Sequence, residues 1–138
     1  MRRTSYVLTA RAAADLREAR AWSRSRWGTE LTNRYFEDLH EGAKYIAENH
    51  ASFRDRHELA GGSALLLYPV REHYLVYEPL APRLIAIVAI IRQGRDIPAI
   101  LQKWAAPIRQ ELIEIRGKVE RGEIRVPSRS APRARRKK

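Results

Sequence analysis

The segment that most constrains the fold is residues 73–92, which read HYLVYEPLAPRLIAIVAIIR. Two runs rich in β-branched and aromatic residues flank a proline-containing turn, which is typical of a strand pair. The second run, residues 83–92, is apolar at nearly every position. It therefore lacks the alternation of apolar and polar residues that a strand with one solvent-exposed face shows. We therefore expect it to be a central strand, covered on both faces over much of its length.

The connections between the predicted strands are short. Only a few residues separate the strands predicted at 63–70, 73–79 and 83–92, and such short connections favour an antiparallel meander. Prolines flank the last connection, and because proline has no N–H for a strand ladder, it belongs at strand ends. The meander should therefore form most of a small sheet.

Two helices are predicted before the meander, after a short strand at residues 6–8. Thr9 offers a hydroxyl to the first free N–H groups of a helix over residues 10–27. A second helix over residues 29–50 carries one apolar stripe, which is made of Leu31, Tyr35, Leu39, Ala43 and Ile46. Because only Gly28 separates the two helices, we expect an antiparallel helix hairpin.

The chain continues well beyond the last predicted strand. Asp96 caps a short helix over residues 97–104, with a proline in its first turn. A further amphipathic helix follows, with a seam of Ile108, Leu112, Ile115 and Val119. This helix either packs on its own domain or needs a partner to cover it. We divide the chain into a domain at residues 1–104, a helical extension at 105–122 and a basic tail at 123–138.

The predicted fold class is α+β. The N-terminal strand and helix hairpin pack on a mostly antiparallel sheet of about four strands, with a short helix after the last strand and an extra C-terminal helix. The 138 residues suffice for one domain with its own core, and the absence of cysteine excludes disulfides and cysteine-ligated metals. No apolar run is long enough to span a membrane, and the N-terminus lacks the apolar core of a signal peptide. We therefore expect a cytoplasmic protein without a membrane partner.

The positive charge is concentrated at the C-terminus. The chain has a net charge of +11, and residues 124–138 contribute seven lysines and arginines without an acid, which leaves +4 (11 minus 7) for residues 1–123. A basic segment rich in proline and serine is typical of a solvated, disordered tail. Such a tail would attract nucleic acid or an acidic partner without reading sequence.

Motifs for cofactor or metal chemistry are absent from the sequence. There is no P-loop, no dinucleotide-binding glycine pattern and no nucleophile elbow. The four histidines do not stand at a metal-ligand spacing such as HExxH. We therefore expect neither a cofactor nor a metal.

The candidate site is a set of polar residues at the ends of the predicted strands. Its members are Arg71, Glu72, His73, Arg92, Gln93, Arg95 and Asp96. In a meander the first and third strands run parallel, so Arg71 and Arg92 can lie at the same end of the sheet. Convergent arginines bind phosphate or stabilise the transition state of RNA cleavage. The alternative is that these residues are solvated edge charges and helix caps, which is the usual state of exposed arginine.

The order of elements, β-α-α-β-β-β and a short helix, is filled by residues that resemble the RelE/ParE superfamily of type II toxins. YVLTARAAADLREARAWSRSRWG resembles the opening strand and first helix of that superfamily, and RYFEDLHEGAKYIAENHASF its second helix and following loop. HYLVYEPLAPRLIAIVAIIRQGRD resembles its closing strands. The resemblance spans residues 6–104, and the Trp27-Gly28 and Gly94-Arg95-Asp96 motifs are closer to the ParE-like branch.

The resemblance implies one of two activities. RelE-like members cut messenger RNA on the ribosome with basic residues and acid–base groups, whereas ParE-like members poison DNA gyrase. A nuclease would use Arg71 and Arg92 on the phosphate, with His73 or Tyr74 as acid or base. Gln93 stands where the superfamily often has a histidine, and no His or Tyr follows Arg95. We therefore expect a ParE-like gyrase inhibitor without catalysis of its own, in which Arg71, Arg92 and Arg95 bind the target.

The resemblance also implies partners. A cognate antitoxin would fold onto the toxin, and operator DNA would be bound only through that antitoxin. Trp22, Phe36 and Tyr45 fall off the apolar stripes, so we expect them to be exposed and to contact the antitoxin. The residues after Trp104 depart from the superfamily pattern and would cover the sheet, dimerise or bind nucleic acid. A third hypothesis is therefore an inactive relative that binds nucleic acid through its basic tail.

Overall fold

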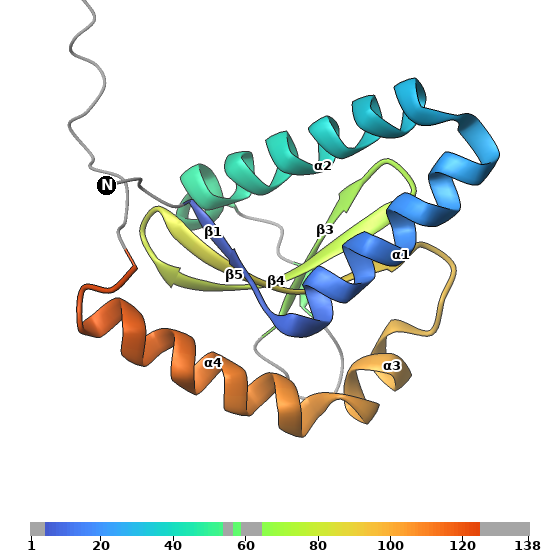
Figure 1. The fold of residues 1–138 in the computed structure, drawn as a ribbon. Helices are drawn as coiled ribbons and strands as arrows, with labels where there is room; N and C mark the ends of the chain where they lie inside the picture. The colour runs from blue at the N-terminus through green and yellow to red at the C-terminus, as the bar shows by residue number, and fades with distance from the viewer. Residues whose placement is uncertain (1–4, 54–56, 59–64, 125–138) are drawn as a thin grey trace, which may run out of the picture.

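The computed structural model describes residues 5–53, 57–58 and 65–124, and it has the predicted α+β class (Figure 1). The elements follow in the order β1 (Tyr6–Leu8), α1 (Ala10–Trp27), α2 (Thr29–Asn49), η1 (His50–Ser52), β2 (His57–Glu58), β3 (Leu66–Val70), β4 (His73–Ala81), β5 (Leu84–Arg92), α3 (Ile97–Lys103) and α4 (Ala105–Glu120). Most of the basic tail and part of the loop before β3 lie outside the described residues.

The central position predicted for the last strand is confirmed. Within the described residues the strands form one five-stranded sheet in the order β1-β5-β4-β3-β2, in which β1 pairs with β5 in parallel and the other pairs are antiparallel. Every residue of β5 from Leu84 to Ile91 is buried. The two-residue β2 extends the four strands that the sequence predicts.

A bulge in β5 sets which side chains face which helical layer. Val76 pairs with Ala89 and Tyr77 pairs with Ile87, so Val88 is an extra residue in β5. A bulge shifts the alternation of side chains by one position. Ile87 and Ile90 consequently face the same core although they are three residues apart.

Two helical layers cover the two faces of the sheet (Figure 1). On one face α1 and α2 pack over a core that includes Leu75, Ile85 and Ile87, and on the other α3 and α4 pack over Val76, Ala86, Val88 and Ile91. In α4 the predicted seam residues Ile108, Leu112 and Ile115 are buried. Of the roles left open for the extension, covering the sheet is therefore the one that the structure shows.

Side chains of α1 complete the edge of β5 beyond the end of β1. The Thr9 hydroxyl accepts from the Ala12 N–H (3.1 Å), as predicted for a cap, and it also donates to the Val88 carbonyl (2.9 Å). Six residues later the carboxylate of Asp15 accepts from the Ile90 N–H (2.9 Å). Beyond Leu8, β5 has no strand neighbour on this edge, and these two side chains bond to its buried backbone groups instead. A buried backbone N–H or carbonyl without a hydrogen-bond partner would lower the free energy of unfolding.

The C-terminal extension also holds the start of α1. Both carboxylate oxygens of Glu111 accept from the Ala10 N–H (2.9 and 3.1 Å), where a negative charge is favourable at a helix N-terminus. The guanidinium of Arg11 lies 4.8 Å from the ring centre of Trp104, and Arg116 pairs with Glu78 of β4. The extension is therefore tied to both the sheet and the first helix.

The helix hairpin agrees with expectation at Gly28 and differs at Leu31. Gly28 has the positive φ (+86°) that favours glycine and joins α1 directly to α2. Leu31 was predicted to lie on the buried stripe of α2, but 52% of its surface is exposed. The prediction was wrong because the first turn of α2 buries its neighbour Thr32 (0% exposed) instead, so the buried face begins one position away from the one read from the sequence.

Thr9→Val should lower the free energy of unfolding by about 1–3 kcal/mol, because it removes both the helix cap and the donor to Val88. Thr9→Ser keeps the hydroxyl and is the matched control. Urea unfolding followed by circular dichroism measures the difference. Equal stability of the valine and serine variants would contradict the bridging role of Thr9.

Leu112→Ala should lower the free energy of unfolding by about 2–4 kcal/mol, because Leu112 is buried between α4 and the sheet. Its neighbour Ile113 is 59% exposed, so Ile113→Ala should change stability by no more than about 0.5 kcal/mol. Thermal and urea unfolding of the pair test whether α4 packs as described. Similar losses in the two variants would refute that packing.

Candidate functional site

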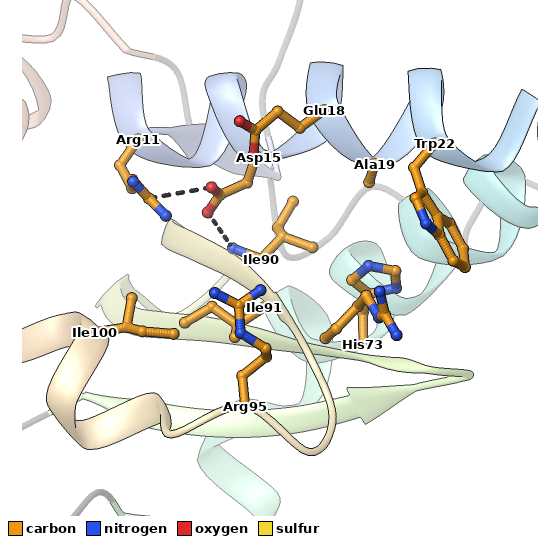
Figure 2. Close-up of a pocket in the computed structure, with 11 residues that line it drawn as sticks. Arg11, Asp15, Glu18, Ala19, Trp22, His73, Ile90, Ile91, Arg95 and Ile100 are labelled. Carbon is orange, nitrogen blue, oxygen red and sulfur yellow. Dashed lines mark hydrogen bonds and ion pairs between the residues drawn. The ribbon is translucent and has the colours of Figure 1, made fainter. Parts of the chain in front are cut away.

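A cleft of about 390 Å³ opens where β1 has ended and α1 crosses the last residues of β5 (Figure 2). Its α1 wall carries Arg11, Asp15, Glu18, Ala19 and Trp22. The opposite wall is formed by His73 of β4, by Ile90, Ile91 and Arg92 of β5, and by Arg95 and Ile100 beyond that strand. The cleft therefore collects charged and aromatic side chains from both ends of the chain.

His73 forms the floor of the cleft and is held by Tyr35. The Glu72 N–H donates to the Tyr35 hydroxyl (3.3 Å), so the hydroxyl proton is free to be donated to the Nδ1 atom of His73, with which it is hydrogen-bonded. We assign Nδ1 as the acceptor of this bond, because the buried Tyr35 hydroxyl has no other hydrogen-bond acceptor among the described residues. With this assignment the proton of the neutral ring lies on Nε2. Only 3% of His73 is exposed, and it lines the cleft. Within the described part of the chain no group bonds to Nε2, which leaves a donor available to the cleft.

The environment of His73 favours the neutral ring. Burial lowers the pKa of His73 below its ordinary value, and the nearby positive charge of Arg92 lowers it further. The negative charge of Glu72 acts in the opposite direction but is the smaller effect. At neutral pH His73 is therefore an uncharged hydrogen-bond donor rather than a cation.

Asp15 is committed to structure rather than to a ligand. Burial raises its pKa, while its hydrogen bond from the Ile90 N–H and the charge of Arg11 act to lower it. The Nε atom of Arg11 lies 3.1 Å from the carboxylate, as the dashed line in Figure 2 shows. Sequence reasoning missed this residue. The available signal was an acid among Ala12, Leu16 and Ala19 on the buried face of α1, because a buried acid requires a partner.

Arg92 and Arg95 are the unpaired cations of the cleft. The guanidinium of Arg92 lies 4.8 Å from the ring centre of Trp22, and that of Arg26 lies 4.8 Å from the same ring. Among the described residues no acidic side chain forms an ion pair with Arg92 or Arg95. Both guanidinium groups are exposed and can pair with an anion.

Of the four residues predicted for a nuclease, three gather around Tyr35 and the fourth, Tyr74, does not. The Arg71 guanidinium lies 5.7 Å from the ring centre of Tyr35, whose hydroxyl is hydrogen-bonded to His73. The backbones of Arg71 and Arg92 do lie at the same end of the sheet, where the Gln93 amide donates to the carbonyls of Arg71 (2.9 Å) and His73 (3.2 Å). The side chain of Arg71, however, donates from Nε to Asp38 of α2 (2.6 Å). Tyr74 packs with the α3–α4 core, on the opposite face of the sheet from the Tyr35–His73 pair.

The three aromatic residues expected to contact a partner differ in exposure. Tyr45 is 50% exposed beside the rings of Phe53 and Tyr68, and Trp22 is partly exposed at the cleft. Phe36 was predicted to be exposed, but it is 8% exposed and belongs to the core. The prediction was wrong because α2 is buried over a stripe wider than the one read from its sequence.

No group of three or more potential ligands among His, Asp and Glu gathers at a possible metal site in the described part of the chain. Helices that could cross a membrane are likewise missing from these residues. The cleft is thus a site of hydrogen-bond donors and cations, and its chemistry rests on Arg92, Arg95 and His73.

The stability of the fold should fall as the pH is lowered past the ordinary pKa of histidine. Because the pKa of His73 is lower in the folded chain than its ordinary value of about 6.5, the unfolded chain takes up this proton first. Stability is therefore fully present above about pH 6.5 and is lost as the pH falls towards the folded-state pKa. Urea unfolding at about pH 7.5 and pH 5.5 should show a larger loss in the wild type than in His73→Gln. An equal loss would mean that His73 does not cause the effect.

Comparison with known proteins identifies the family. The sequence model described as "ParE toxin of type II toxin-antitoxin system, parDE" matches residues 6–97. Toxin ParE of Escherichia coli is 34% identical over 94 residues, which cover 68% of this chain and 89% of that protein. A chain in the solved structure of the chromosomal ParDE TA system from P. aeruginosa has a similar fold, with a TM-score of 0.53 and 20% identity, over 64% of this chain and 95% of that one. The chain therefore belongs to the ParE toxin family of type II toxin–antitoxin systems, within the RelE/ParE superfamily.

Proposed function

We propose that this protein is a toxin that inhibits DNA gyrase, and thereby replication, without catalysis of its own and is neutralised by a cognate antitoxin. Family membership supports the toxin class and the antitoxin partner. The observation that supports the non-catalytic choice is that two of the four candidate nuclease side chains are not available: Arg71 pairs with Asp38, and Tyr74 lies on the opposite face of the sheet. We place the activity in the cytoplasm, where gyrase and an antitoxin would be met, and we assign operator binding to the antitoxin.

The loss of Arg71 and Tyr74 from the candidate set matters because general acid–base catalysis requires groups within hydrogen-bond reach of the same reacting atoms. Arg71 is held by Asp38, and Tyr74 lies on the other face of the sheet. His73 and Arg92 remain near each other, but the acid–base group bonded to His73, the Tyr35 hydroxyl, is buried and is already hydrogen-bonded to His73 and to the Glu72 N–H. One observation still favours ribosome-dependent RNA cleavage as a second candidate, namely the neutral His73 beside two unpaired arginines.

Arg92 and Arg95 are the proposed target-binding residues. They are unpaired, exposed and carried on the rigid end of β5 and the turn that follows it. Arg71 would contribute to the target only by leaving Asp38, so its role is weaker than the sequence predicts. Trp22 and Tyr45 remain the proposed antitoxin contacts, while Phe36 would contribute only through its packing in the core.

Induction of the chain alone in bacteria should stop thymidine incorporation before methionine incorporation. The double variant Arg92→Gln/Arg95→Gln should lose most of this effect, because it removes the unpaired cations that bind the target. Arg109→Gln is the matched control, since Arg109 is an exposed arginine on α4 and lies outside the cleft. Supercoiling by purified gyrase gives the direct measurement, with circular dichroism to confirm that each variant is folded.

The outcomes separate the hypotheses. An earlier fall in methionine incorporation, with messenger RNA cut on ribosomes, would reject gyrase inhibition in favour of the nuclease. Normal growth and normal supercoiling would reject both activities. Activity that disappears only when the basic tail is removed would favour nucleic-acid binding by an inactive relative.

A further inference from the structure

We propose that the cleft between α1 and the end of β5 receives one acidic side chain of the antitoxin, whose carboxylate accepts the Nε2–H of His73 and pairs with Arg95. This inference rests on the proposed function for the identity of the partner. The chemistry of the occupant is argued from the cleft itself.

The donors that face the cleft call for an anion. The hydrogen bond between the Tyr35 hydroxyl and Nδ1 of His73 holds the ring, and with Nδ1 assigned as its acceptor the protonated nitrogen is Nε2. Figure 2 shows His73 and Arg95 on the sheet side of the cleft, facing α1 across it. A carboxylate bonded to a buried donor and to an arginine makes charge-assisted hydrogen bonds, which are stronger than neutral ones.

The acids of the cleft limit the anion to a small one. Asp15 and Glu18 stand on the α1 wall, opposite the arginines. Asp15 is neutralised by Arg11, whereas Glu18 forms no ion pair within the described residues. A phosphate backbone, with one charge on every nucleotide, would meet Glu18 as it passed through the cleft. A single carboxylate can bind at Arg95 and leave Glu18 to accept from an N–H of the same peptide.

The lining of the cleft also fits an acidic side chain. A volume of about 390 Å³ leaves room for such a side chain together with part of the backbone that carries it. Trp22, Ile91 and Ile100 supply an apolar boundary for the methylene groups of an aspartate or glutamate. The Trp22 ring, flanked by Arg26 and Arg92, forms one edge of the cleft and would cover the bound chain.

Two acids near the C-terminal extension are already engaged: Glu111 of α4 bonds to the Ala10 N–H, and Glu78 of β4 pairs with Arg116 of α4. Within the described residues no acid pairs with Arg95, so the proposed acid comes from the antitoxin. An antitoxin that fills the cleft would cover Arg92 and Arg95, the residues proposed above to bind the target. Occupation of the cleft thus explains neutralisation by direct competition.

The test is a double-mutant cycle with the antitoxin encoded beside this chain. Each Asp and Glu in its toxin-binding segment is changed to the amide, and affinities are measured by titration calorimetry against wild type, Arg95→Gln and the control Arg109→Gln. We expect Arg95→Gln to weaken binding about tenfold, as for other close interfacial charge pairs. When the one acid that pairs with Arg95 has been changed to its amide in the antitoxin, Arg95→Gln should weaken binding less than about twofold. Arg109→Gln should have no effect on binding to either the wild-type or the amide-substituted antitoxin.

A second readout follows His73 directly. In ¹⁵N spectra of the histidine ring, binding of the wild-type antitoxin should shift the Nε2 signal and slow exchange of its proton, and the amide variant at the coupled acid should abolish both changes. Tyr35→Phe removes the hydrogen bond from the Tyr35 hydroxyl to Nδ1 of His73. It should weaken binding of the wild-type antitoxin, and it should weaken binding much less when the coupled acid of the antitoxin has been changed to its amide.

The results distinguish the inference from the function on which it rests. Tight binding in which no acid couples to Arg95 would overturn the inference and leave the toxin–antitoxin function intact. Failure of the wild-type chain to bind the antitoxin would overturn both. Binding of a short RNA oligonucleotide that is lost in Arg95→Gln but not in Arg109→Gln would assign the cleft to phosphate and overturn the inference.

Discussion

The structure depends on how the edge of β5 is satisfied after β1 ends. Thr9 and Asp15 take over from the strand, and they bond to the Val88 carbonyl and the Ile90 N–H. Because these side chains belong to α1, the helix is fixed directly above the end of the sheet, at the distance that leaves a cleft. If β1 were longer, a strand would fill this space and His73 would be covered. The site is thus a direct result of an incomplete parallel pair.

Much of the fold could be predicted because it depends on local patterns. The continuous apolar run of β5, the cap at Thr9 and the Asp96 side chain that accepts from the Ala99 N–H are visible in short windows of sequence. The bulge at Val88 could not be predicted, since it depends on the register between strands. Leu31 and Phe36 were misplaced for a similar reason, because the burial of a helix position depends on where the sheet lies beneath it.

The site was predictable in its location but not in its composition. Strand-end reasoning placed Arg71, His73 and Arg92 at one end of the sheet, which is correct for their backbones. It could not tell that Arg71 turns to Asp38 while Arg92 turns to Trp22, because both choices depend on helices distant in sequence. The α1 wall was missed because Asp15 was not recognised as a polar residue within an apolar stripe. Side-chain direction, rather than the position of the backbone, is therefore what the sequence could not show at this site.

The contact between Glu111 and the Ala10 N–H has a consequence for when the cleft can form during synthesis. The two residues are 101 positions apart, and β5 likewise pairs with β1 across most of the domain. Contacts between residues so distant in sequence form late and slow the folding of a chain. During synthesis the first helix leaves the ribosome long before the residues that cap it and cover the sheet. The cleft therefore takes its final shape only after α4 has left the ribosome, long after the residues of its α1 wall.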